Sequence, residues 1–496
     1  MLDRRDVLGM IGAAALAPVA VRAFAEPLQD DIRWWSTSDA GSWQAVPPPP
    51  VEPVAKSFFA WDVMVQFTNP AQEMGGFGGA FSELGWQAVA KLPKAIRDRA
   101  IRDLFGDDGA AFTLCRTPLG ADDFSRQWYS YDETDGDFAL RNFSVSNDRE
   151  TLVPFIHAAQ HVRPDLKLWA SPWSPPTWMK TNKHYAQFPS LPGSPSNGLR
   201  ADQIGREGVD TFIQDDRYFE AYARYFARYV MEYRKLGIPI TTVMPQNEFN
   251  SPQPFPSCCW TPAGLGRFIP FLGQEMNKLG VAIMLGTLER SSADLITKVL
   301  EDPKAAPFIK GIGVQWAGKG ALGELAKRHP QLPLWGTEQE CGVGTNDWHY
   351  ARYGWNLIKR YLGAGASVWQ YWNMALPLNG VSTWGWPQNA LISVDTEQGH
   401  YTLNPDYWVM KHVASQVRPG ARYLPTQSLS GFENQIAFRN PNGDLVLVIE
   451  NDMPVAQKVN IILGGKQISP TLVPSSYNTI IVPATLLATG GIGKPK

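Results

Sequence analysis

The chain has 496 residues, 44% of them hydrophobic, which is enough for one large domain with a smaller one beside it. Its 45 basic and 47 acidic residues give a formal net charge of -2, which argues against a nucleic-acid or anionic-membrane partner. Four cysteines form no regular framework, the seven histidines include no HExxH pattern, and no internal repeat is present. We therefore expect no metal site and no repetitive adhesive protein.

The first 25 residues have the pattern of a twin-arginine signal peptide. Arg4 and Arg5 precede an apolar run, residues 9–21, and Ala23-Phe24-Ala25 fits a small-x-small cleavage site. The run is shorter than a membrane-spanning helix needs, so we expect no integral span in the mature chain. The alternative is an uncleaved anchor or a chance arginine pair. The signal predicts an exported protein, periplasmic or secreted.

Residues 26–74 are predicted to contribute one strand to a later domain. A proline run at residues 47–50 favours an exposed, extended segment over residues 26–54. Residues 57–67 are rich in aromatic and β-branched types and predict a strand. The next stretch, residues 75–81, holds four glycines without P-loop spacing, and a tightly packed barrel strand is the better interpretation.

From residue 75 to residue 418, strands and helices alternate, which predicts parallel βα units. Helices are predicted at residues 93–105, 149–161, 217–236, 262–279 and 350–362. The predicted strands end at Ala80, Arg116, Ser171, Glu248, Gly286, Trp316, Glu338 and Trp372. Eight strands close a (β/α)8 TIM barrel, so the fold class is α/β. A long Pro/Gly/Ser loop, residues 188–205, is expected to cover one face of its site.

Two glutamates stand at the ends of predicted barrel strands. Glu248 follows the fourth strand and Glu338 ends the seventh. Side chains at the carboxyl ends of barrel strands face the substrate. One such glutamate alone would more simply be a solvated loop residue, but two carboxylates are what glycoside hydrolysis needs.

After residue 418 the pattern changes to short strands. Residues 435–439 and 445–450 flank a hairpin signal at residues 440–444, and residues 459–463 and 477–482 continue as strands. We predict a small β-sandwich over residues 419–496, joined by the strand at residues 57–67. The tail from Ala484 is expected to be loose.

Several motifs give the chain a family likeness. They are GFGGAF (residues 76–81), ASPWSPPTWMK (170–180), QNE (246–248) and TEQEC (337–341). In this order and spacing the chain resembles glycoside hydrolase family 30, the glucosylceramidase-like family, from about residue 75 to the C-terminus. The resemblance implies a barrel with a side β-sandwich that hydrolyses β-glycosidic bonds with retention and without a cofactor.

The resemblance also implies roles for individual residues. Glu248 would be the general acid and Glu338 the nucleophile, while Asn247 would hydrogen-bond the sugar 2-hydroxyl. Glu340 is a rival nucleophile, because strand alternation puts Glu338 and Glu340 on one face. The motif position favours Glu338 and leaves Glu340 a supporting role.

The same resemblance predicts a sugar pocket lined by Asp123, Trp173, Trp316 and Trp372, with Arg116 holding the carboxylates. For each tryptophan the alternative is an ordinary core position.

Three departures from the family pattern are Phe249 after the Asn-Glu pair, Ala317 where glucosylceramidases carry a tyrosine, and Gln315 in place of a histidine. The substrate thus stays open among a β-glucoside, a glycolipid and a β-glucan. The expected function is a glucosylceramidase-like retaining β-glycosidase. An endo-acting β-1,6-glucanase and a non-catalytic sugar-binding barrel are the alternatives, and the oligomeric state stays open.

Overall fold

The centre of the molecule is a closed barrel of eight parallel strands. The computed structural model describes residues 31–54 and 61–487. The barrel strands follow one another around the barrel in chain order. They are β5 (Gly76–Ala80), β6 (Leu114–Pro118), β7 (Lys167–Ser171), β8 (Ile240–Val243), β9 (Ala282–Leu288), β10 (Ile309–Gln315), β11 (Leu334–Glu338) and β12 (Ala366–Asn373). The predicted (β/α)8 barrel is confirmed, and each predicted strand corresponds to one of the eight, although β8 ends at Val243 and not at the predicted Glu248.

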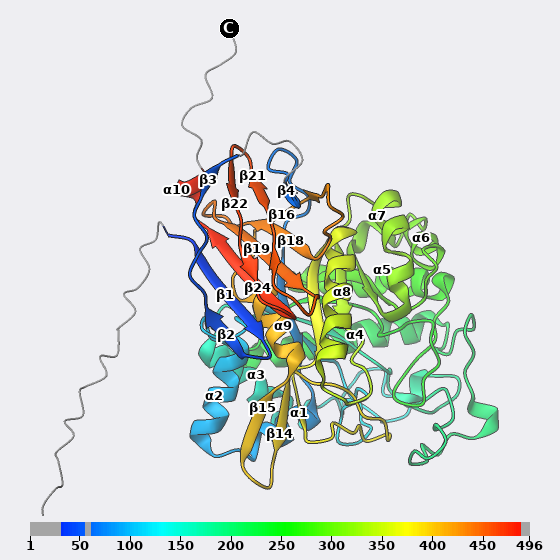
Figure 1. The fold of residues 1–496 in the computed structure, drawn as a ribbon. Helices are drawn as coiled ribbons and strands as arrows, with labels where there is room; N and C mark the ends of the chain where they lie inside the picture. The colour runs from blue at the N-terminus through cyan, green and yellow to red at the C-terminus, as the bar shows by residue number, and fades with distance from the viewer. Residues whose placement is uncertain (1–30, 55–60, 488–496) are drawn as a thin grey trace, which may run out of the picture.

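Helices surround the barrel and follow the predicted strand-helix alternation (Figure 1). They are α1 (Glu83–Ala90), α2 (Lys94–Phe105), α3 (Leu152–Val162), α4 (Asp216–Lys235), α5 (Pro262–Leu279), α6 (Asp294–Leu300), α7 (Leu322–Arg328), α8 (Trp348–Gly363) and α9 (Pro405–Ala414). Helix α5 shows how the sequence sets such bounds. The Thr261 hydroxyl accepts from the Gly264 amide, proline occupies the first turn, and Gly280 ends the helix at φ 69°.

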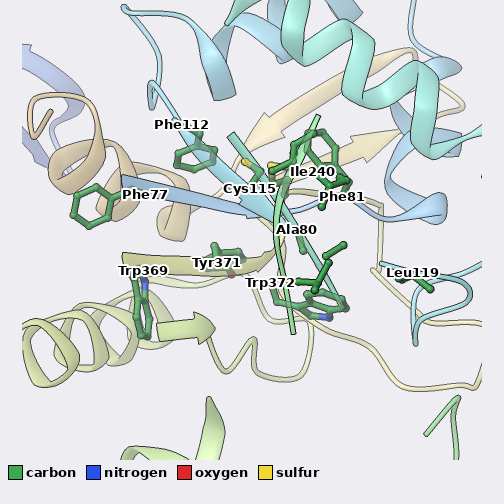
Figure 2. Packing of buried hydrophobic residues seen from close by; sticks show 14 of the residues in the cluster. Phe77, Ala80, Phe81, Phe112, Cys115, Leu119, Ile240, Trp369, Tyr371 and Trp372 are labelled. Carbon is green, nitrogen blue, oxygen red and sulfur yellow. The ribbon is translucent and has the colours of Figure 1, made fainter. Parts of the chain in front are cut away.

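The barrel interior requires glycine where strands meet most closely. A Cβ atom on Gly78 of β5 would lie 1.9 Å from the Leu114 carbonyl oxygen of β6, so any side chain there would push the strands apart. Figure 2 shows the packing around this point, where Ala80, Phe81 and Cys115 come together. The glycine-rich motif at residues 76–81 is therefore a packing feature of the barrel wall.

A two-sheet β-sandwich packs beside the barrel (Figure 1). The first sheet contains β16 (Arg422–Leu424), β18 (Gln435–Arg439), β19 (Leu445–Asn451), β24 (Ser476–Val482), β1 (Arg33–Ser38) and β2 (Gly41–Ala45), in that order. The second contains β17 (Thr426–Gln427), β4 (Val63–Val65), β21 (Ile461–Leu463), β22 (Lys466–Ile468) and β3 (Glu52–Pro53). A separate apolar cluster, including Trp34, Val63, Leu447 and Ile480, fills the space between them.

Smaller sheets complete the chain. One contains β13 (Ala375–Pro377), β14 (Ile392–Asp395) and β15 (His400–Leu403), and another β20 (Gln457–Lys458) and β23 (Thr471–Leu472). Within the described part of the chain, no helix is both long and apolar enough to cross a membrane.

The N-terminal segment contributes more to the sandwich than the sequence predicted. Residues 26–54 were expected to be exposed and extended, but β1 and β2 form a hairpin whose first strand pairs with β24. In β1 the buried Trp34 indole N–H donates to Asn478 Oδ1 at 3.0 Å. The expectation was wrong for β1, because its partner strand lies more than 400 residues away, which local sequence does not show. It holds for the proline run at residues 47–50, which is largely exposed.

Two other predictions lie partly outside the described residues. In the strand predicted at residues 57–67, the structure has β4, and residues 55–60 are not described. The tail from Ala484 begins with a short helix, α10 (Ala484–Leu487), whose Leu486 and Leu487 pack on the sandwich core, so its start is not loose. The predicted signal peptide, residues 1–25, also lies outside the described residues and stays a prediction.

The N-terminal hairpin is expected to stabilise the fold. Trp34→Ala removes a buried indole and leaves Asn478 without its donor, so we expect the free energy of unfolding to fall by about 3–5 kcal/mol. Val54→Ala, at an exposed position of the same segment, should change it by no more than about 0.5 kcal/mol. Urea denaturation of both variants measures the difference. Equal stability of the two would contradict a structural role for β1.

Candidate active site

Two carboxyl groups face one cavity at the carboxyl end of the barrel. Asn247 and Glu248 follow β8, and Glu338 is the last residue of β11. Both glutamates are buried, with 6% and 5% of their surface exposed. The cavity has a volume of about 280 Å³. Its lining residues are Asp123, Trp173, Asn247, Glu248, Gln253, Phe255, Glu289, Trp316, Glu338, Trp386 and Gln388.

One amide group links the two carboxyls. Gln315, the last residue of β10, places its Nε2 3.2 Å from Glu248 Oε1 and 3.2 Å from Glu338 Oε2. These two oxygens therefore lie no further apart than twice that distance. The Thr337 hydroxyl donates to Gln315 Oε1 at 2.9 Å, which fixes the orientation of the amide.

Glu338 is surrounded by strong hydrogen-bond donors. Arg116 Nη1 donates to its Oε2 at 2.6 Å, and Trp316 Nε1 donates to its Oε1 at 2.7 Å. Burial raises the pKa of Glu338, and the Arg116 charge and these donors oppose that rise. The donors all stabilise the ionised form, which is the form a nucleophile needs.

Glu248 has a less charged environment. Its Oε2 accepts from Gln253 Nε2 at 2.8 Å and its Oε1 from Gln315, both neutral amides. Burial, followed by the nearby Glu338 charge, raises the pKa of Glu248 to about 7. A carboxyl group with this pKa is protonated in about half of the molecules at neutral pH, and that proton can be donated.

The backbone is strained at two residues of the site. Glu248 and Trp316 adopt φ angles of 46° and 47°, in the left-handed region that side chains rarely occupy. Such conformations cost of order 1–3 kcal/mol each and persist only where the surroundings hold them. At Glu248 the backbone N–H donates to Thr287 Oγ1 at 2.8 Å. Both strained residues line the cavity.

Asn247 is held by its amide oxygen. Its Oδ1 accepts from Arg116 Nη2 at 2.7 Å, from Thr287 Oγ1 at 3.2 Å and from Gln315 Nε2 at 3.2 Å. These three donors identify this atom as the oxygen of the Asn247 amide, so the Nδ2 group points away from them. Asn247 also lines the cavity. The Asn247 amide can therefore donate to a ligand beside the two carboxyls.

The predicted aromatic residues occupy two layers. Trp173 and Trp316 line the cavity, as does Asp123. Trp372, 1% exposed, stacks on Trp173 with ring centroids 5.3 Å apart and lies outside the cavity lining. Burial, with the charges of Asp122 and Glu338, raises the pKa of Asp123 well above its usual range.

Glu340 does not face the carboxyl pair. Strand β11 ends at Glu338, so the alternation that would bring Glu340 back to the same face does not continue. Its carboxylate instead accepts from Lys319 Nζ at 2.6 Å and from the Tyr353 hydroxyl at 2.7 Å. Glu340 is also outside the cavity lining.

Sequence reasoning missed a second group of cavity residues. Gln253 and Phe255 lie in the loop after β8, Glu289 directly follows β9, and Trp386 and Gln388 lie in the loop between β13 and β14. The only sequence signal was position, because these loops come after the barrel strands β8, β9 and β12 in the chain, on the side that carries the site. Gln315 was noticed as a departure, without its bridging role.

The described residues contain no metal-ligating cluster. Among residues 31–54 and 61–487, no group of three or more His, Cys, Asp or Glu side chains is placed to hold a metal ion. The cavity side chains offer carboxyl, amide and indole groups, whose chemistry is proton transfer, nucleophilic attack and hydrogen bonding.

The barrel and its paired glutamates define a TIM-barrel glycosidase. Residues 74–416 match the family described as glycosyl hydrolase family 30 TIM-barrel domain. The chain belongs to glycosyl hydrolase family 30 and is a glycosidase.

The relatives that match this chain are named as glucosylceramidases or as endo-1,6-beta-D-glucanases. The chain is 28% identical over 406 residues to putative glucosylceramidase 1 of Caenorhabditis elegans, covering 77% of this chain and 74% of the relative. It is 27% identical to lysosomal acid glucosylceramidase of Mus musculus, covering 77% and 75%. It is 25% identical to endo-1,6-beta-D-glucanase neg1 of Aspergillus fumigatus, covering 86% and 88%.

Solved structures share the whole architecture. SrfJ from Salmonella typhimurium superposes with a TM-score of 0.78 at 23% identity, covering 91% of this chain and 99% of that one. An endo-beta1,6-glucanase superposes with a TM-score of 0.76 at 19% identity, with the same coverage. At these identities the likeness concerns the fold.

The ion pair between Arg116 and Glu338 is expected to contribute strongly to stability. Arg116→Met leaves Glu338 buried without its cation, so we expect the free energy of unfolding at pH 7 to fall by about 3–5 kcal/mol. Arg328→Met breaks exposed ion pairs with Asp294 and Glu324 and should lower the free energy of unfolding far less, because solvent screens these charges. Denaturant unfolding compares the two variants. A loss at Arg116 no larger than at Arg328 would contradict this assignment.

Proposed function

We propose that the protein is a retaining β-glycosidase that cleaves β-glucosyl bonds, with Glu338 as nucleophile and Glu248 as general acid and base. The observation that carries the proposal is the single Gln315 amide hydrogen-bonded to both carboxyls. Glu248 Oε1 and Glu338 Oε2 each lie 3.2 Å from its nitrogen, so these two oxygens are separated by no more than twice 3.2 Å. Inverting pairs stand about 6.5–9.5 Å apart to admit a water, whereas retaining pairs stand about 5–5.5 Å apart.

The reaction takes two displacements. In the first, Glu338 attacks the anomeric carbon, the bond to the glycosidic oxygen breaks, and Glu248 gives that oxygen its proton. Esterification then removes the Glu338 charge, which had helped to raise the pKa of Glu248. The pKa of Glu248 falls, so Glu248 can take a proton from the water that attacks the glycosyl-enzyme. The second displacement inverts the anomeric carbon again, so the product keeps the β configuration of the substrate.

The remaining cavity residues are proposed to hold the sugar. Asn247 Nδ2 would donate to the 2-hydroxyl, a contact that strengthens in the transition state. Asp123, Trp173 and Trp316 would line the rest of the ring, with Trp372 supporting Trp173 from behind. The choice of a glucosyl unit is supported by the relatives, which are named glucosylceramidases and endo-1,6-beta-D-glucanases.

Azide rescue distinguishes the two carboxyls. Glu338→Ala should abolish turnover of an aryl β-glucoside, and added azide should restore it from the opposite face to give an α-glucosyl azide. Glu248→Ala should still react with a dinitrophenyl β-glucoside, whose leaving group needs no proton, and azide should then give the β-glucosyl azide.

Glu340→Ala is the matched control and should keep turnover without azide. Product anomers are read by proton NMR. The same anomer from both site variants would overturn the assignment, and so would loss of turnover in Glu340→Ala alone. Unimpaired turnover in Glu338→Ala would overturn the proposed function itself.

The pH profile should report the protonation of Glu248. Because Glu248 must hold its proton to act as an acid, kcat/KM should fall as the pH rises through about 7. The limb should appear with a methyl β-glucoside, whose leaving group needs the proton, and should be absent from both the unchanged enzyme and Glu248→Gln when the substrate is a dinitrophenyl β-glucoside. Initial rates from pH 4 to 9 measure both profiles. An alkaline limb that persists unchanged in the variant would assign it to another group.

A further inference from the structure

A second cavity adjoins the one that holds the carboxyl pair. It has a volume of about 460 Å³ and shares four lining residues with the first. They are Gln253, Phe255, Glu289 and Trp386. The residues unique to it are Phe188, Leu191, Glu207, Ser251, Pro252, Pro254 and Arg290.

The second cavity lies on the side of Glu248. Five of its residues, Ser251 to Phe255, belong to the loop directly after Glu248, and Gln253 Nε2 donates to Glu248 Oε2 at 2.8 Å. The leaving group of a glycosidase departs toward the general acid. Under the proposed roles of the two glutamates, the second cavity therefore receives the leaving group.

One wall of this cavity is apolar and aromatic. The rings of Phe255 and Trp386 pack against each other with centroids 5.1 Å apart, at the boundary of the two cavities. Phe188 and Leu191, each 45% exposed, extend the apolar surface outward. An aromatic face of this kind can bind the C–H face of a sugar ring or part of a lipid chain, so it does not choose between them.

The other wall is charged, and its charges favour a sugar over a lipid chain. Arg290 is the centre of a cluster: its guanidinium contacts the Glu289 carboxylate, its Nε lies 3.2 Å from Glu207 Oε2, and its Nη2 donates to Ser251 Oγ at 3.1 Å. An alkyl chain laid over this cluster would remove three charged groups from water without giving them new hydrogen bonds, which is costly. Sugar hydroxyls can accept from the guanidinium and donate to the carboxylates.

We propose that the second cavity binds a sugar unit as the leaving group, so that the substrate is a β-linked oligosaccharide or polysaccharide and not a glycolipid. The proposal rests on the proposed roles of Glu248 and Glu338. The first cavity, at about 280 Å³, is slightly smaller than the usual range for small-molecule sites and holds one sugar. The second holds the next sugar, with Arg290, Glu289 and Glu207 binding its hydroxyls.

The test compares three substrates: an aryl β-glucoside, a β-1,6-linked glucotriose, and glucosylceramide in detergent micelles. In Arg290→Met, kcat/KM for the triose divided by kcat/KM for the aryl glucoside should fall about 10–100-fold, as expected for loss of charged hydrogen bonds. Glu207→Gln keeps the side-chain shape and should lower the same ratio in the same direction. Thermal unfolding of both variants shows whether they are folded.

Arg267→Met is the matched control, because Arg267 pairs with Asp216 on the surface and lines neither cavity. It should leave the ratio unchanged. A kcat/KM for glucosylceramide above that for the triose, or a ratio unchanged in folded Arg290→Met and Glu207→Gln, would overturn the sugar assignment. Glu338→Ala separates the two proposals. If this variant loses activity on all three substrates while the ratio is unchanged in Arg290→Met and Glu207→Gln, the proposed function holds and only the leaving-group assignment fails.

Discussion

The site depends on one buried ion pair. Arg116 is fully buried and Glu338 nearly so, and taking two charges out of water costs several kcal/mol per ion unless every charged atom is hydrogen-bonded. The barrel supplies partners from several strands to the two terminal nitrogens of Arg116, while its buried Nε has no hydrogen-bond partner. Arg116 also donates to Ser171 of β7 and to Asn247 after β8, and its guanidinium lies 4.2 Å from the Trp173 ring centroid. The ion pair thus fixes the positions of four strand ends at once.

The same pair explains why two equally buried glutamates differ chemically. Glu338 receives a cation and an indole N–H, whereas Glu248 receives only neutral amides. Desolvation raises the pKa of both, but the cation opposes it at Glu338 while the Glu338 charge adds to it at Glu248. Two carboxyls whose surroundings separate their pKa values in this way are suited to different roles in one reaction.

Sequence reasoning predicted the parts of the fold that local pattern controls. Barrel strands are buried on both faces, so short apolar runs that alternate with helices revealed all eight, and the strand-end rule selected Glu248 and Glu338. It failed where distant segments decide. Strand β1 pairs with β24, and the buried Thr37 hydroxyl pairs with His412 of α9, partners that no local pattern indicates. Trp372 likewise looked like a pocket residue, whereas the Arg116–Trp173 stack places it behind the pocket.

Loop residues were hardest to predict, yet they connect the two cavities. Gln253 donates to the Glu248 carboxyl and also to Ser251, which in turn accepts from Arg290. The Gln253 N–H lowers the pKa of Glu248, because it stabilises the charged form. A leaving group that takes the place of this amide at Glu248 Oε2 removes that stabilisation and raises the pKa of the acid. Occupation of the second cavity would therefore strengthen the tendency of Glu248 to hold its proton until the glycosidic oxygen can receive it.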